Sequence, residues 1–295
     1  MSAVTHALVR GRSAEARPAR FQTGWELPAG ITILVVLVLT SVFVPVISPY
    51  DPNALSASIL QGPSAAHLFG TDQYGRDLLV RVALSIRLDY SIAIVGVGFS
   101  LVVGTTLGVL AGSARRSIWG TLLMRATDAI ISIPFILLVL LIVLSIGPTW
   151  SPLGIPQGVP ALMIAIFLTG WPIFARISRT QATSVMSEDF ILSAQLMGYS
   201  KRRIVFKHVV PNVSSQVLTY AMTDCIMIIA LTGGLAFLGA GVLPPTPELG
   251  SIMNEGKSII TTAPWVTFFP ACAILLSAIA VSLSVNGILN RQNQK

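Results

Sequence analysis

The sequence contains little charge. Only 11% of its 295 residues are Asp, Glu, Lys or Arg, whereas 53% are hydrophobic, and the mean hydropathy is positive. Soluble domains normally carry about a quarter charged residues. This deficit and the long apolar runs indicate a membrane protein and argue against a water-soluble domain. The net charge of +7 is therefore interpreted first as a sign of which side of the membrane the Lys and Arg residues face, and not as evidence of a nucleic-acid partner.

Cysteine and histidine are also scarce. Cys225 and Cys272 lie within apolar stretches, where they read as small packing residues. His6, His67 and His208 are far apart and form no HExxH or similar motif. The sequence predicts no metal site, and the absence of a Ser-His-Asp order or paired intramembrane aspartates argues against an enzyme.

The N-terminal region lacks the features of a cleaved signal. Arginines at positions 10, 12, 17 and 20 precede an apolar run over residues 27–48. That run is longer than a secretory apolar core and has no A-x-A cleavage site. We expect a cytosolic tail over residues 1–25 and a retained transmembrane helix over residues 26–48.

Six membrane spans are predicted from the apolar runs. Hydrocarbon cannot satisfy backbone N–H and C=O groups, so each span should be a helix. The uncharged stretch after Asp128 is too long for one helix, and GPTWSPLGIPQGVP divides it in two. Glycines 96, 98, 104 and 108 fit close helix packing. The expected spans are residues 28–47, 90–111, 121–146, 159–177, 213–238 and 265–288.

The basic residues predict the orientation of these spans. In a six-span arrangement, fifteen Lys and Arg residues fall on one face and four on the other. The positive-inside rule then places both termini and the segment 180–212 in the cytosol, with residues 289–295 as a C-terminal tail. The segment 180–212 would interrupt a membrane core spanning residues 90–288.

This cytosolic segment has the pattern helix, glycine, helix. Phe190, Ile191, Ala194 and Met197 are spaced to share one helical face, and Gly198 suits a left-handed C-terminal position. One interpretation is a short helix seated in a partner's groove. The other is a solvated loop whose basic residues only hold it inside, and the pattern favours neither.

Several motifs resemble those of a known family. Leu192, Ser193 and Ala194 stand where the coupling motif of ABC importer permeases has E-A-A, and Gly198 matches its glycine. His208 takes the later apolar position, and Val210-Pro211 takes that of Leu-Pro. HLFGTDQYGRDLLVR, DAIISIPFILLVL, FLGAGVLPPTPELG and APWVTFFP are similar to segments of the second permease subunit of dipeptide, oligopeptide and nickel importers. The resemblance covers residues 25–287.

The resemblance implies an all-α membrane protein with the six-helix type I ABC importer permease fold. It also implies four kinds of partner: a second homologous permease subunit, two ATPase subunits that hold ATP and Mg, an extracytoplasmic binding protein, and membrane lipid. No cofactor is expected in this chain. Glu188 and Asp189 stand in for the missing glutamate of the motif. The expected ATPase-coupling residues are Glu188, Asp189, Ser193, Ala194, Gly198, Tyr199, Lys201, Arg202 and Pro211.

Other charged residues have two interpretations each. Asp224, the one acid well inside a predicted span, either lines the solute pathway or makes a packing hydrogen bond. In the predicted external loop 49–89, Asp72, Arg76, Asp77 and Arg81 are spaced for an interfacial helix with internal ion pairs. Alternatively, Asp72 and Arg76, with Pro244 and Pro245 of a second loop, contact the binding protein.

The sequence gives less support to two other functions, ATP binding by this chain and transport without ATPases. GSIMNEGKS is not a phosphate loop, because five residues separate Gly250 from Gly256 where that loop requires four. A pump of this sequence therefore needs energy from another subunit. A secondary transporter or channel without ATPases is the alternative, but we find no internal repeat, and Gly233-Gly234 is the one candidate helix break.

Overall fold

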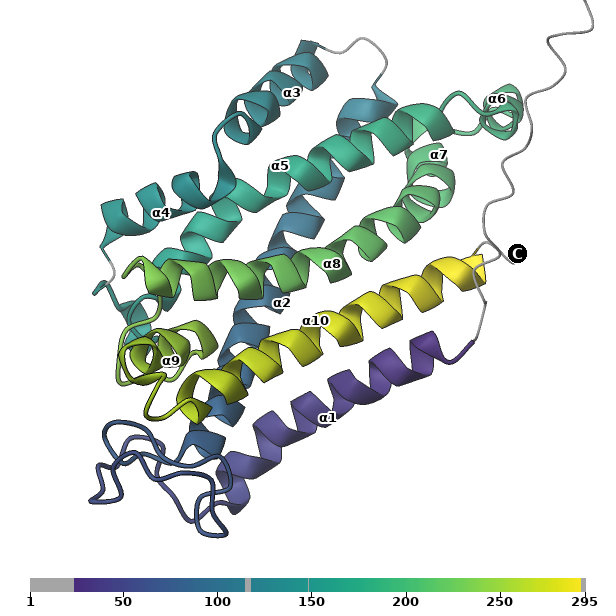
Figure 1. Ribbon diagram of the computed structural model, residues 1–295. Coiled ribbons are helices and arrows are strands. Elements are labelled where there is room, and N and C mark those ends of the chain that lie inside the picture. Colours follow the sequence, from purple (N-terminus) through teal and green to yellow (C-terminus); the bar gives the residue numbers. More distant parts are fainter. Residues whose placement is uncertain (1–23, 115–117, 148, 293–295) are drawn as a thin grey trace, which may run out of the picture.

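The computed structural model describes residues 24–114, 118–147 and 149–292, and this part of the chain forms helices and no β-strand (Figure 1). The predicted tail 1–25 lies almost entirely outside the described residues. The α-helices are α1 (Glu26–Ile47), α2 (Leu78–Ser113), α3 (Ile118–Ile131), α4 (Phe135–Ile146), α5 (Val159–Val185), α6 (Asp189–Leu196), α7 (Lys201–Ile204), α8 (Val210–Phe237), α9 (Leu249–Gly256) and α10 (Trp265–Gln292). Short turns of 3-10 helix occur at Pro152–Gly154 and Lys257–Ile259, and Val205–Val209 is a π-helix.

The long helices form a bundle with two different ends. The irregular segment 48–77 and helix α9 lie at one end, and α6 and α7 lie at the other (Figure 1). Five helices are long and apolar enough to cross a membrane: α1, α2, α5, α10 and the continuous helix Lys201–Ala236. The bent pair α3 and α4 makes a sixth crossing if it counts as one span.

The predicted span 121–146 is not one straight helix. Helices α3 and α4 meet at 87°, and Ser132, Ile133 and Pro134 lie in the break. Pro134 has no N–H to donate and disfavours helical geometry in the residue before it, which explains why the helix ends here. The proposed break at Gly233-Gly234 is wrong, because α8 is continuous through both glycines.

The predicted interfacial helix within 49–89 is also wrong. No helix occurs between Ile47 and Leu78, and Asp77 instead begins α2 by accepting a hydrogen bond from the N–H of Val80 at 3.0 Å. Positive φ angles at Gly70 and Gly75 turn the chain away from helical geometry before this point. Helix α2 therefore starts twelve residues before the predicted start of its span at residue 90.

Glycines in α2 allow α5 to approach its backbone. A Cβ atom on Gly104 would lie 2.6 Å from Cβ of Phe174, and one on Gly108 would lie 2.8 Å from Cβ of Ser178 and closer still to the carbonyl of Ala175. Gly96 is similarly blocked by a side chain of α5. The predicted packing role is therefore confirmed for these three glycines. It is wrong for Gly98, which has nothing within 4 Å.

This contact gives a direct test of the bundle. Gly108→Leu should destabilise the folded protein by more than about 2 kcal/mol, since the new side chain would force two backbones apart. The matched control Gly98→Leu points into open space and should be neutral or slightly stabilising, because leucine is the better helix former. Thermal unfolding of both variants in detergent measures the difference, and equal midpoints would contradict the packing described here.

Candidate functional site

The segment around Gly198 has the predicted helix, glycine, helix structure. Gly198 has a φ of +79°, and its N–H donates to the carbonyl of Gln195 at 2.9 Å. The N–H of Tyr199 donates to the carbonyl of Ala194 at 3.1 Å. These two bonds form a Schellman motif, which ends α6 and reverses the chain within two residues. Glycine tolerates this left-handed conformation because it has no Cβ.

Helix α7 runs directly into α8. The hydroxyl of Ser200 accepts a hydrogen bond from the N–H of Arg203 at 3.3 Å and caps α7. The π-helix Val205–Val209 then joins α7 to α8, so one helix continues over Lys201–Ala236. The predicted start of this span at residue 213 is therefore too late. Pro211, which has no N–H to donate, follows directly after the π-helix, where the helix already departs from the regular α-helical hydrogen-bond pattern.

Helix α6 is attached through only part of its predicted apolar face. Ile191 and Ala194 are buried in the main hydrophobic core, but Phe190 and Met197 are exposed. The four residues predicted to share one helical face are therefore not equivalent: Phe190 is about 100° round the helix from Ile191, and Met197 lies beyond the end of α6 at Leu196. Leu192 and Leu196 (81% exposed) of α6 are exposed apolar residues, and so is Phe206 (73% exposed) of the π-helix that follows α7.

The other predicted coupling residues differ in how far they are exposed. Glu188, Asp189, Ser193, Lys201, Arg202 and Pro211 are exposed. Tyr199 is half-buried, and the guanidinium of Arg203 lies 4.2 Å from the centre of its ring. Glu188 occupies the N-cap position of α6 without capping it through its side chain, which leaves its carboxylate available to a partner. The segment 188–206 thus carries exposed apolar, acidic and basic side chains, and we call its exposed side chains the α6–α7 surface.

Asp224 lies about halfway along α8 and is partly buried. Among the described residues, no hydrogen bond or ion pair to its carboxylate is present. The packing hydrogen bond considered from the sequence is therefore not made within this part of the chain. Thr219 and Thr223 precede Asp224 on α8, with Thr223 exposed. An acid at this depth of a membrane-spanning helix faces another subunit or water more readily than lipid.

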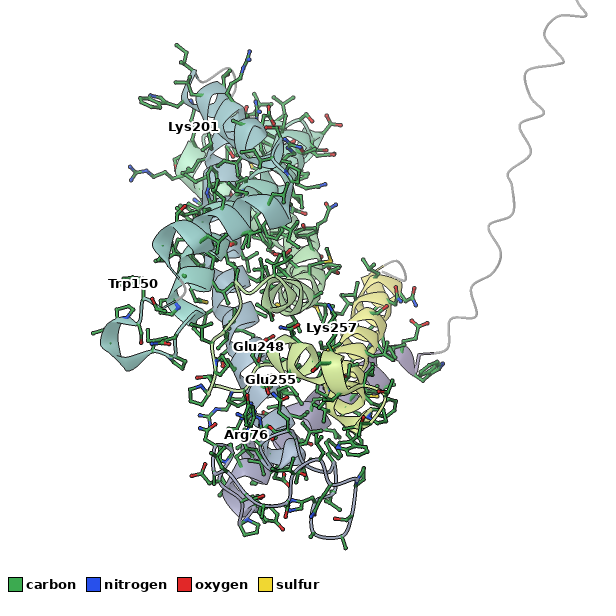
Figure 2. All side chains as sticks on the ribbon, turned by 60° about the vertical axis from the view of Figure 1, so that its left-hand side comes forward. Arg76, Trp150, Lys201, Glu248, Glu255 and Lys257 are labelled. Carbon is green, nitrogen blue, oxygen red and sulfur yellow. The ribbon has the colours of Figure 1, made fainter. Side chains whose placement is uncertain are left out.

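At the opposite end, buried charges hold the segment 48–77 against α2 and α9. Arg76 donates to Asp72 at 2.6 Å and to Glu255 of α9 at 2.9 Å. Arg81 of α2 lies 3.5 Å from the same carboxylate of Asp72 and donates to the carbonyl of Pro52 at 3.1 Å. Figure 2 shows Arg76, Glu255 and Glu248 close together, far from Lys201. We call Asp72, Arg76, Arg81 and Glu255 the charge cluster.

Burial corrects one of the docking predictions. Asp72 and Arg76 are 1% and 5% exposed, so they brace the fold and offer almost no surface to a binding protein. The ion pair between them was predicted correctly, although it forms in a loop and not in a helix. Pro244 and Pro245, by contrast, are exposed and stay available for docking.

The sequence interpretation missed the acids of α9. GSIMNEGKS lies almost entirely in this helix, whose N-cap Glu248 accepts hydrogen bonds from the N–H groups of Gly250 and Ser251 at 2.9 and 2.6 Å. Burial raises the pKa of Glu255, although the guanidinium of Arg76 opposes that rise. No local pattern pairs Arg76 with a residue 179 positions later, and glutamate is not among the residues preferred at an N-cap, so the sequence signalled neither role.

Comparison with known proteins identifies this architecture. The family model described as "Binding-protein-dependent transport system inner membrane component" matches residues 104–295. The chain belongs to this family of permeases. It is therefore a multi-pass inner-membrane protein, and the predicted all-α type I ABC importer permease fold is confirmed.

Several relatives of the permease match along most of their length. The chain is 32% identical to the dipeptide transport system permease protein DppC of Alkalihalophilus pseudofirmus, over 90% of this chain and 84% of the relative. It is 29% identical to the oligopeptide transport system permease protein OppC of Bacillus subtilis, over 94% and 88%. It is 33% identical to the glutathione transport system permease protein GsiD of Escherichia coli, over 94% and 88%. These relatives confirm the predicted resemblance.

The charge cluster gives the second prediction. Arg76→Met should cost about 3–5 kcal/mol, because Asp72 and Glu255 would stay buried without one of their cations. The loss should shrink as the pH falls, since a protonated carboxyl is less costly to bury than an ionised one. The control Arg87→Met changes an exposed arginine of α2 and should cost less than about 0.5 kcal/mol. Unfolding midpoints across pH measure both, and equal losses at every pH would argue against a charge effect.

Proposed function

We propose that this permease is the transmembrane subunit of an ATP-driven importer that carries small peptides or related solutes. The observation that carries this proposal is the exposed α6–α7 surface, joined without a break to a membrane-spanning helix. Relatives named for dipeptide, oligopeptide and glutathione transport favour a peptide-like cargo. Glutathione is itself a small peptide, so one chemical class covers the three names.

The α6–α7 surface would be the docking site for an ATPase subunit. Its apolar part, at Leu192, Leu196 and Phe206, is suited to a groove in a partner. The exposed basic residues Lys201 and Arg202 would add specificity through charge complementarity. ATP and Mg would be held by two ATPase partners, so the permease would take no catalytic part in hydrolysis.

The continuous helix would transmit the movement. When ATP binding draws the two ATPases together, a force on α7 acts directly on α8, because Lys201–Ala236 is one helix. A rigid element of this kind can bias the bundle between inward-open and outward-open packings. The complex would also contain a second, homologous permease subunit. Both termini and α6 would lie in the cytosol, as the distribution of basic residues predicts.

The opposite end would receive solute from an external binding protein. Pro244 and Pro245 are exposed there and are the docking residues that we retain. The solute would then pass along α8, where Asp224 would meet the ammonium group of a peptide N-terminus. No nucleic acid has a role in this function.

Uptake into vesicles distinguishes this function from the alternative. Proteoliposomes containing the permease, its partner permease and both ATPases should accumulate peptide only when ATP and the loaded binding protein are present. Accumulation without ATPases would instead establish a secondary transporter or channel. Each partner is omitted in turn, so the assay also tests the composition of the complex.

Gly198→Val tests the docking site. A β-branched residue at a φ of +79° costs about 1–2 kcal/mol in the left-handed conformation, and the α6–α7 turn should distort. We expect the variant to insert in the membrane but to co-purify with less ATPase. The matched control is Gly147→Val at the other end of the bundle, where φ is +92° and nothing lies within 4 Å of the new Cβ. Normal ATPase recovery with Gly198→Val would contradict the docking assignment.

Asp224→Asn tests the pathway. If the carboxylate meets a peptide ammonium, uptake of a free dipeptide should fall about tenfold, equivalent to about 1.4 kcal/mol. Uptake of the same dipeptide with an acetylated N-terminus should change little, because that group carries no charge. An equal loss for both peptides, or a lowered unfolding midpoint, would indicate that Asp224 packs against another subunit instead.

A further inference from the structure

Two buried carboxylates meet at the N-terminus of α9. Glu248 is the N-cap of this helix and is fully buried, and Asp89 of α2 is 1% exposed. Oδ2 of Asp89 accepts a hydrogen bond from the N–H of Leu249 at 3.3 Å. Both side chains therefore lie against the same helix end, although 159 positions separate them in the sequence.

The two carboxylates differ in how well they are satisfied. Both oxygens of Glu248 accept backbone N–H groups, from Gly250 at 2.9 Å and from Ser251 at 2.6 Å. Oδ1 of Asp89 is buried and has no hydrogen-bond partner. Because the two oxygens of one carboxylate share a carbon, this Oδ1 lies beside the same end of α9.

No cation balances the two acids within the described residues. The ion pairs there join Arg76 and Arg81 to the acids of the charge cluster, Arg176 to Asp128 and His67 to Asp77. None of them reaches Asp89 or Glu248. The remaining polar groups that act on the pair are neutral hydroxyls: Thr232 of α8, Ser251 of α9 and Tyr90 of α2, whose hydroxyl bonds that of Ser277 on α10. A partner subunit has no access to acids this deeply buried.

Two neighbouring carboxylates cannot both stay ionised in such a place. Each charge loses its hydration, and each repels the other, so one group retains a proton. The partial positive charge at the N-terminus of α9 favours one anion, and the two N–H donors favour Glu248 as that anion. Burial raises the pKa of Glu248, whereas these N–H groups oppose the rise.

We propose that the pair Asp89 and Glu248 binds one proton in the folded permease, and that this proton is on Asp89, at the Oδ1 that accepts no hydrogen bond. The neutral acid lets α9 stay attached to α2 without repulsion. Helix α9 also packs on α8 where Gly250 meets Gly233, and it reaches the segment 48–77 through Glu255. Loss of the proton would therefore loosen a helix on which three other parts of the chain depend. This inference is independent of cargo and ATP.

Infrared spectroscopy of the purified importer, with its full complement of subunits, tests the proton directly. A neutral carboxylic acid has a carbonyl stretch that a carboxylate lacks. At neutral pH this band should lose intensity in Asp89→Asn relative to the wild type, and it should keep its intensity in the control Asp128→Asn, which changes an exposed carboxylate paired with Arg176. A wild type without the band, or an Asp89→Asn variant that retains all of it, overturns the proposal. The first outcome would show an ionised Asp89 held by water or a bound cation.

Stability against pH gives an independent readout. At neutral pH the folded pair binds a proton that the unfolded chain has released, so stability should fall as the pH rises through this range. Asp89→Asn is neutral at every pH and should lose this dependence, while Glu255→Gln should keep it. Equal slopes in the wild type and Asp89→Asn contradict the proposal.

A second variant covers failure of Asp89→Asn to assemble. Glu248→Gln removes the charge that repels an ionised Asp89, so the acid band should disappear at a lower pH than in the wild type. If the band disappears at the same pH in Glu248→Gln as in the wild type, the charge of Glu248 does not affect the protonation of Asp89, and the proposed pair is contradicted. None of these readouts involves transport, so failure of this inference and failure of the proposed function are distinguishable.

Discussion

Hydrocarbon neither donates nor accepts hydrogen bonds, and this constraint organises the whole permease. Every backbone group at membrane depth must find its partner within the protein, so the long apolar runs form helices. Polar structure is then restricted to the two ends of the bundle and to a few buried side chains. The break between α3 and α4 is the exception among the described spans, and it occurs where Pro134 has no N–H to donate.

The two ends of the bundle are stabilised in different ways. The α6–α7 surface depends on local contacts: a Schellman turn at Gly198 and a cap at Ser200, each made between residues a few positions apart. The other end depends on contacts between distant segments, such as Arg76 with Glu255 and Trp265 with the carbonyl of Thr71 at 3.1 Å. One end is thus held by non-covalent contacts between distant segments, while the other presents a small unit, stabilised by local contacts, at the end of a long helix.

This asymmetry suits a subunit that is moved from one side. A short helix with few buried contacts can follow a partner, and the continuous helix behind it carries the displacement into the bundle. The buried acids and arginines at the opposite end resist such movement, because separating them would expose charges without partners. Helix α9 is central to that resistance, since α2, α8 and the segment 48–77 all contact it.

The sequence by itself determined the membrane class, most helix positions, the glycine turn at Gly198 and the packing role of three glycines in α2. These features depend on residues that are close in the chain or on composition, so a linear pattern contains them. Tertiary structure alone decided which charges are buried. From the sequence, Arg76 and Asp72 could be surface residues, but in the fold they are buried and Arg76 pairs with Glu255, 179 positions later. Asp89 likewise has a partner only because α9 packs against α2. Burial and long-range pairing result from how the helices are placed in space, and no local pattern encodes that placement.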